Sequence, residues 1–237
     1  MQEIITDPRP LVPLSEFSGS LSSRVYFSLK NAIFSVVYMP GEILRKGEVC
    51  EILGVSRSPV SEAVAKLAND GLVNIVPQAG TFVSRLSMDR IREGAFTREA
   101  LELAAVGLVA RTVTDDQLEL LDECLGQQKS LIDDHDGVGF YKADLKMHGL
   151  ILSFTGYRNL ERMAELSWVQ VDRARNMHLP TPGRLQETLA EHRGIVKALA
   201  ARDPELAQKL TRQHLAQLIQ YLEPMEREHP DMFEPSK

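Results

Sequence analysis

The sequence predicts a mainly α-helical protein, in which a small domain of three helices and a β-hairpin precedes an all-α antiparallel bundle of about six helices. Apolar residues recur at helical spacing through most of the chain, which favours helices over strands. Only one pair of short β-prone runs, 72–76 and 81–84, interrupts this pattern. The expected segments are an N-terminal arm at 1–18, a first domain at 19–84, a linker continuous with the first bundle helix at 85–95, a second domain at 96–226 and a tail at 227–237.

Composition limits the class of protein. The chain has 237 residues, 43% of them hydrophobic and 25% charged, which is ordinary for a soluble protein of two modest domains. The N-terminus lacks a secretory signal pattern and the longest apolar stretch is too short to cross a bilayer, so we expect a cytoplasmic protein with no membrane partner. Cys50 and Cys124 are isolated, so a disulfide framework is not expected.

Charge is unevenly distributed along the chain. Residues 19–85 contain seven Lys/Arg and five Asp/Glu, whereas residues 86–237 contain nineteen and twenty-five. The front of the chain is therefore mildly basic and the rest is acidic, for a net charge of -6. This distribution fits a DNA-binding domain attached to a body of another kind.

The first domain begins with two predicted helices. Leu21, Val25 and Leu29 recur at helical spacing, and Pro40-Gly41 ends that helix. A short second helix is predicted from about Gly47 to Leu53. Gly54 then supplies the residue without Cβ that a tight turn between helices needs.

The third helix begins within Ser56-Arg57-Ser58-Pro59, where a serine can cap it and proline is tolerated in the first turn. The two β-prone runs that follow are joined by Pro77-Gln78-Ala79-Gly80, which predicts a β-hairpin. Together these elements predict a winged helix-turn-helix domain. The alternative is a small mixed domain with no nucleic-acid role.

The second domain is predicted to be entirely helical. Ser87 caps a helix of about 24 residues that ends near Arg111, and Thr114 begins the next. No strand alternation interrupts the remainder, and short loops favour antiparallel neighbours. The further helices are expected at about 138–155, 158–178, 183–201 and 204–226.

Four side chains of this bundle form a candidate metal site. Asp144 and His148 are spaced i, i+4, so both project from one helix face, and His192 and His214 lie on two later helices that can converge there. Imidazole nitrogens and one carboxylate suit zinc, nickel or manganese better than calcium or magnesium. A single histidine in a helix is more often a core or surface residue, and it is the set that indicates metal binding.

The stretch PGEILRKGEVCEILGVSRSPVSEAVAKLANDGLVNIVPQAGTFV resembles the winged-helix domain of the GntR family of bacterial transcription regulators, over about residues 21–84. The resemblance implies binding to a palindromic operator, with Arg57 reading guanine and the wing tip entering the minor groove. Gly47 and Ser61 stand where the family often has arginine, so Arg45 and Lys46 are either substitutes or ordinary solvated residues. The implied DNA-binding residues are Arg45, Lys46, Ser56, Arg57, Ser58, Ser61, Gln78 and Gly80.

Residues 88–224 resemble the FCD effector domain of the FadR-type branch of that family, through FTREALE at 96–102, DLKMH at 144–148, EHR at 191–193 and RQHL at 212–215. The resemblance implies that Asp144, His148, His192 and His214 bind zinc or a similar ion, with open positions for a carboxylate effector. It also implies that Arg98 reaches into the pocket, the alternative being a surface ion pair with Glu102. Asn159 and Arg173 are further effector-binding candidates.

These inferences predict a homodimeric, ligand-responsive transcription regulator, a repressor, whose second domain binds a metal and a small organic acid. One alternative is the same regulator with a purely structural metal. Another is a metal-dependent hydrolase or lyase with Glu191 as general base, but Glu191 adjoins a ligand and points about 100° away on the helix. No HExxH, GxSxG or P-loop pattern supplies further machinery for an enzyme.

Overall fold

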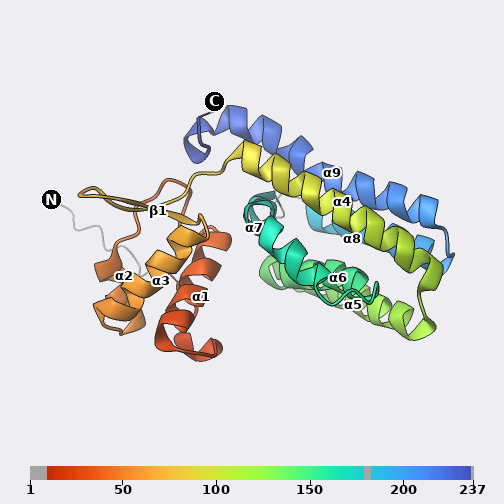
Figure 1. Ribbon diagram of the computed structural model, residues 1–237, viewed down its shortest axis with the longest axis horizontal. Helices are drawn as coiled ribbons and strands as arrows, with labels where there is room; N and C mark the ends of the chain where they lie inside the picture. The colour runs from red at the N-terminus through yellow and green to blue at the C-terminus, as the bar shows by residue number, and fades with distance from the viewer. Residues whose placement is uncertain (1–9, 179–182, 236–237) are drawn as a thin grey trace. The chain divides into compact units, whose positions relative to one another are not determined.

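A computed structural model describes residues 10–178 and 183–235 (Figure 1). The protein is mainly helical, as predicted, with one two-stranded sheet in the described ranges. It divides into two compact units. The first comprises the residues through Ser87 together with the segment that starts at His229, and the second is Met88–Glu228. Within the described ranges, no helix combines the length and apolar character needed to cross a membrane.

The first unit is built on helices α1 (Leu21–Phe34), α2 (Lys46–Leu53) and α3 (Arg57–Asn69). The side chain of Ser20 caps α1 by accepting a hydrogen bond from the backbone N–H of Ser23. Gly54 ends α2 with φ of 63°, in the left-handed region that favours glycine. The tight turn between α2 and α3 follows from this residue, and it confirms the predicted helix-turn-helix.

The predicted hairpin is also present. Strands β1 (Val73–Val76) and β2 (Gly80–Val83) pair antiparallel, with Val73 opposite Val83. Ile43, in the segment before α2, forms a further antiparallel bridge with Phe82. This hairpin is the wing of the domain, and the bridge ties it to the chain that enters the helix-turn-helix.

The segment after His229 packs within the first unit. Leu86 donates its backbone N–H to the carbonyl of Met232 at 2.9 Å, and Glu234 donates to the carbonyl of Leu86 at 2.7 Å. Arg85 Nε donates to the carbonyl of Asp231 at 2.8 Å. The side chains of Leu86 and Phe233 are buried. The segment that begins at His229 lies within the predicted tail at 227–237, and it forms part of the same compact unit as the wing.

The second unit is a bundle of six helices in the described ranges. Thr114 and Gln117 form a reciprocal capping box at the start of α5, as expected for a Thr-x-x-Gln helix start. In Figure 1, α4 and α9 run side by side along the unit. The helices are α4 (Met88–Thr112), α5 (Asp115–Asp133), α6 (Gly137–Ser153), α7 (Leu160–His178), α8 (Arg184–Ala200) and α9 (Pro204–Glu228).

The apolar core of this unit lies among α4, α5, α6 and α8. It includes Val106, Leu121, Met147 and Leu199, all fully or almost fully buried. Burial of apolar surface is the main favourable contribution to folding, so this core fixes the helices against one another. The polar side chains described below occupy a second buried region of the same bundle.

Candidate metal centre and effector pocket

The structure brings the four predicted metal ligands together. Asp144 and His148 lie one turn apart on α6, His192 lies on α8 and His214 on α9. One ligand atom from each residue lies within 4.8 Å of those of the other three, and all four residues are buried. Three separate helices therefore converge on one point.

The spacing of these atoms fits a metal ion. His192 Nε2 lies 3.5 Å from Asp144 Oδ1, and His214 Nε2 lies 3.3 Å from His148 Nε2. Two ligands that are each about 2.1 Å from one ion lie at most about 4.2 Å apart, so only small side-chain movements would be needed. Asp144 Oδ1 and His192 Nε2 are buried without a hydrogen-bond partner among the described residues. Such orphaned acceptors are what a site for a cation would contain.

Each histidine is held from its opposite edge. His148 Nδ1 contacts Glu102 Oε2 at 2.6 Å, and His214 Nδ1 contacts Glu191 Oε2 at 2.6 Å. His192 Nδ1 contacts the amide oxygen of Gln128 at 2.9 Å. Because these partners are acceptors, they require the ring proton on Nδ1 and leave the Nε2 lone pairs free to bind an ion.

The carboxylate of Asp144 is held in the same way. Its Oδ2 accepts a hydrogen bond from Arg175 Nη2 on α7, while its Oδ1 faces the histidines. Glu102 lies on α4 and Gln128 on α5, so each of the six helices contributes a ligand or a partner of a ligand. A site supported by every helix of the unit is a preorganised one.

Electrostatics favour the ligand forms of these groups. Burial lowers the pKa of His148 to about 4, against the opposing effect of Glu102, and burial also places the pKa of His192 well below its usual value. Burial alone would raise the pKa of Asp144, but Arg175 and the histidines lower it below its usual range. At neutral pH these three residues are therefore neutral imidazoles and a carboxylate, the protonation states that bind metals.

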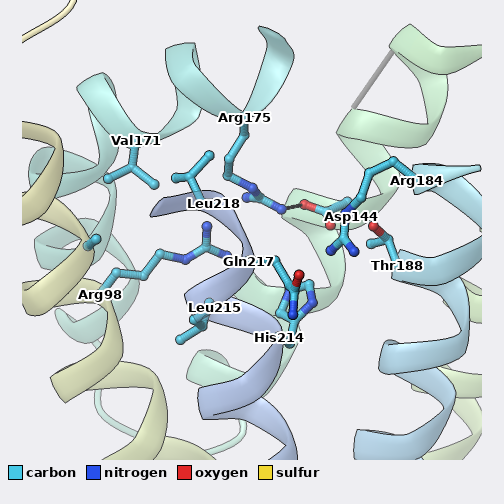
Figure 2. Close-up of a pocket in the computed structure, with 11 residues that line it drawn as sticks. Arg98, Asp144, Val171, Arg175, Arg184, Thr188, His214, Leu215, Gln217 and Leu218 are labelled. Carbon is cyan, nitrogen blue, oxygen red and sulfur yellow. Dashed lines mark hydrogen bonds and ion pairs between the residues drawn. The ribbon is translucent and has the colours of Figure 1, made fainter. Parts of the chain in front are cut away.

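A cavity opens beside the cluster (Figure 2). Its volume is about 40 Å³, and both Asp144 and His214 line it. Figure 2 shows three guanidinium groups directed toward it from three helices: Arg98 from α4, Arg175 from α7 and Arg184 from α8. An anionic ligand could reach both the arginines and the metal ligands in this cavity.

The three predicted effector-binding residues have different positions. Arg98 lines the cavity and forms a buried ion pair with Glu102 at 2.6 Å, so the contact with Glu102 and the pocket position occur together. Arg173 is buried but is not among the residues that line the cavity. Asn159 is exposed, because it precedes the first residue of α7 and lies outside the bundle interior.

Several residues of the site were not predicted from sequence. Gln128, Arg175, Arg184 and Thr188 have no motif that distinguishes them from ordinary helix residues. Glu102 was considered only as a surface partner of Arg98, and the apolar residues Ala105 and Val106, at i+3 and i+4 on the same helix face, were the available signal that it faces inward. Glu191 contacts His214 Nδ1, and Arg184 holds its carboxylate with two hydrogen bonds of 2.9 and 2.8 Å.

The predicted DNA-contacting residues lie on the surface of the first unit. Ser56, Arg57 and Ser58 are exposed at the start of α3, and Ser61 is exposed one turn later. Gln78 (φ 62°) and Gly80 (φ 132°) are exposed in the turn of the wing. Arg45 is exposed and pairs with Glu48 at 3.2 Å, and the neighbouring Lys46 is partly exposed.

Comparison with known proteins identifies the family. Residues 21–83 match the bacterial regulatory proteins of the gntR family, and residues 94–217 match the FCD domain. The chain belongs to the GntR family of transcription regulators. It is 30% identical to the HTH-type transcriptional repressor RspR of Escherichia coli K12. The 213 aligned residues cover 90% of this chain and 93% of that protein. The chain is therefore a DNA-binding transcription regulator with an FCD effector domain.

Solved structures agree on the fold. A GntR transcriptional regulator from Rhodococcus sp. RHA1 is similar with a TM-score of 0.73 and 25% identity, over 86% of this chain and 97% of that one. E. coli McbR is similar with a TM-score of 0.73 and 24% identity, over 88% of this chain and 99% of that one. The fold of this chain is thus shared with these proteins.

Proposed function

We propose that this protein is a homodimeric repressor of the FadR type that releases or binds its operator in response to a small organic acid held at a divalent metal ion. Asp144, His148, His192 and His214 would hold the ion, and zinc is the best match to three imidazoles and one carboxylate. When bound, the ion would supply a Lewis acid with open positions for a carboxylate oxygen.

One observation carries this proposal: two of the four candidate ligands, Asp144 and His214, line the same cavity as the buried guanidinium of Arg98. Arg98 Nη2 is buried without a hydrogen-bond partner among the described residues, although its Nε pairs with Glu102. A purely structural metal needs neither a cavity nor an unpaired donor beside it. A carboxylate effector would satisfy both groups, because guanidinium and metal each favour carboxylate oxygens.

The DNA-binding role is assigned to the exposed start of α3 and to the wing. Arg57 would read a guanine in the major groove, with Ser56, Ser58 and Ser61 beside it, and Gln78 and Gly80 would approach the minor groove. Arg45 and Lys46 would contact phosphates. A two-fold dimer would place two copies of α3 on a palindromic site.

Regulation requires that the effector and the operator favour different arrangements of the chain. A coupling free energy of about 1 to 3 kcal/mol would change operator affinity roughly 5- to 150-fold. The helices that would carry such a change are α4 and α9, since Arg98 and Glu102 lie on one and His214 on the other.

The test is an operator-shift titration with protein that is zinc-loaded, chelator-treated or reloaded, each with and without a panel of small carboxylic acids. The proposal expects an acid-dependent change in operator affinity that disappears with the metal and returns on reloading. Operator affinity of the zinc-loaded protein that responds to no acid would contradict the effector role and leave a structural metal as the alternative. Conversion of many molecules of an acid per protein molecule would instead indicate an enzyme.

A further inference from the structure

Resting on the proposed function, we infer that the effector is a dianion, a small acid with two carboxylates, whose two ends are bound on opposite sides of the cavity. One carboxylate would lie on the side of the metal ligands, near Thr188. The other would reach the guanidinium of Arg98. The inference depends on the number and placement of unpaired donors, and on the sum of the buried charges.

The cavity has more unpaired donors than one carboxylate can satisfy. Among the described residues, the buried atoms Arg98 Nη2, Arg175 Nη1, Arg184 Nε and Thr188 Oγ1 have no hydrogen-bond partner, and all four residues line the cavity. Buried polar groups are almost always paired in folded proteins, so this concentration of donors indicates a ligand rich in acceptor oxygens.

The donors lie on two sides. Figure 2 shows Arg98 on one side of the cavity and Asp144, Arg184 and Thr188 on the other, with Arg175 reaching down from α7. The apolar side chains of Val171, Leu215 and Leu218 line the cavity as well. A single carboxylate could fill only one side, whereas an acid with a short carbon linker could place a carboxylate on each.

The sum of the charges leads to the same ligand class. Arg98 pairs with Glu102, Arg175 with Asp144 and Arg184 with Glu191, so these three pairs are neutral. Arg173 and Asp172 add one further positive and one further negative charge on α7. When the exposed carboxylate of Glu187, which also pairs with Arg184 at 3.4 Å, is left out of the sum, a divalent ion on neutral histidines leaves the buried groups with two excess positive charges. Uncompensated charge is unfavourable in a buried site, and a dianion cancels it where a monoanion does not.

The test compares acids that differ only in the second carboxylate. Zinc-loaded full-length protein would be titrated calorimetrically with malonate and propionate, succinate and butyrate, and glutarate and pentanoate. We expect at least one dicarboxylate to bind about tenfold or more tightly than its monocarboxylate partner, because it gains a charge-assisted hydrogen bond at the second end. Zinc content is measured in every sample.

Variants assign the two ends. Arg98→Gln should remove most of the preference for the dicarboxylate, since it removes the charge at the far end. Thr188→Val should weaken the dicarboxylate and the monocarboxylate by similar factors, because both place a carboxylate on the metal side. Thr211→Val is the matched control: Thr211 is also a buried threonine with an unpartnered hydroxyl, but it does not line the cavity. Both acids should bind the Thr211→Val protein as tightly as they bind the unaltered protein.

The possible outcomes distinguish a failure of the dianion from a failure of the proposed function. Monocarboxylates that bind as tightly as their partners, or a preference that survives in Arg98→Gln, would overturn the dianion and leave the metal-dependent sensor in place. If no acid of either kind binds the zinc-loaded protein, both the dianion and the proposed function are wrong. If Arg98→Gln does not fold, the comparison of matched acids on the unaltered protein still decides.

Discussion

Glu102 contacts His148 Nδ1 at 2.6 Å through one carboxylate oxygen and Arg98 Nε at 2.6 Å through the other. A single carboxylate thereby orients a candidate metal ligand and a candidate effector-binding group. Burial alone would raise the pKa of Glu102, but Arg98 and His148 lower it below its usual range, so the group is ionised. Glu102 is a positioning residue that links the two halves of the site.

Glu102→Gln should weaken zinc binding about 10- to 100-fold, because replacing the partner of a metal-bound imidazole has effects of this size. Competition with a chromophoric chelator measures the affinity. Glu99→Gln is the control, since Glu99 lies on the same helix but is partly exposed and pairs with Arg212. Equal zinc affinity in all three proteins would mean that Glu102 does not orient a metal ligand.

His192→Ala should lose stoichiometric metal, because His192 Nε2 is one of the four convergent ligand atoms. His135 is exposed, contacts the backbone carbonyl of Asp133 and does not belong to this group, so His135→Ala should retain the metal. Elemental analysis after chelator-free purification measures both. Amide hydrogen exchange in α1–α3 should be unchanged, and a His192→Ala protein with full metal content would refute the ligand assignment.

Arg57→Ala should weaken specific operator binding by about 1 to 3 kcal/mol if its guanidinium makes a bidentate contact with guanine. Arg57→Lys keeps the charge but loses the planar fork, so it should restore binding to non-specific DNA more than to the operator. Shift assays at one fixed salt concentration compare the two kinds of DNA. Operator affinity that does not change in Arg57→Ala would exclude the contact.

Phe233→Ala should destabilise the first unit by about 3 kcal/mol, since it removes a buried aromatic side chain that lies beside Leu86. Faster hydrogen exchange at the amide of Leu86, which donates to Met232, would report the loss. Met232→Ala keeps that carbonyl and changes a side chain that is only partly buried, so its effect should be smaller. Equal exchange rates in both variants would argue against a structural role for this segment.

Tyr26→Phe should destabilise the same unit by about 1 kcal/mol, because Tyr26 donates a hydrogen bond of 2.5 Å to Asp70. Burial and Asp70 raise the pKa of Tyr26 above its usual value of 10.0. The contribution is therefore complete below about pH 10 and is lost as the pH rises beyond it. Urea unfolding at pH 7 and pH 11 should show a smaller difference between the proteins at pH 11. Tyr157→Phe, at an exposed tyrosine, serves as the control.

Local signals account for what the sequence predicted well. Gly54, the Thr114 cap and the apolar spacing along α1 each act within one or two turns, so the helices, their order and the wing could be expected from the residues alone. The convergence of Asp144 with three histidines was predicted from helix spacing and from family resemblance together. The four side chains do lie together, whereas their binding of a metal is still a prediction.

The rest depends on contacts between helices that are far apart in sequence. Gln128 reaches His192 across 64 positions, and Glu102 reaches His148 across 46. No local pattern states which face of a long helix a glutamine or glutamate occupies once the helices pack. Asn159, an effector-binding candidate named beside the family resemblance, is exposed in the loop before α7, a position that no pattern in the sequence indicates.

The return of the chain from His229 to Leu86 also affects how the protein is made. The strand-like pairing with Phe233 can form only after the ribosome has synthesised all six helices between Met88 and Glu228. Domains generally fold as they emerge during translation. The first unit can therefore be completed only after the chain that follows α9 has been made, so a truncation ahead of Phe233 would leave this unit without a segment that packs within it.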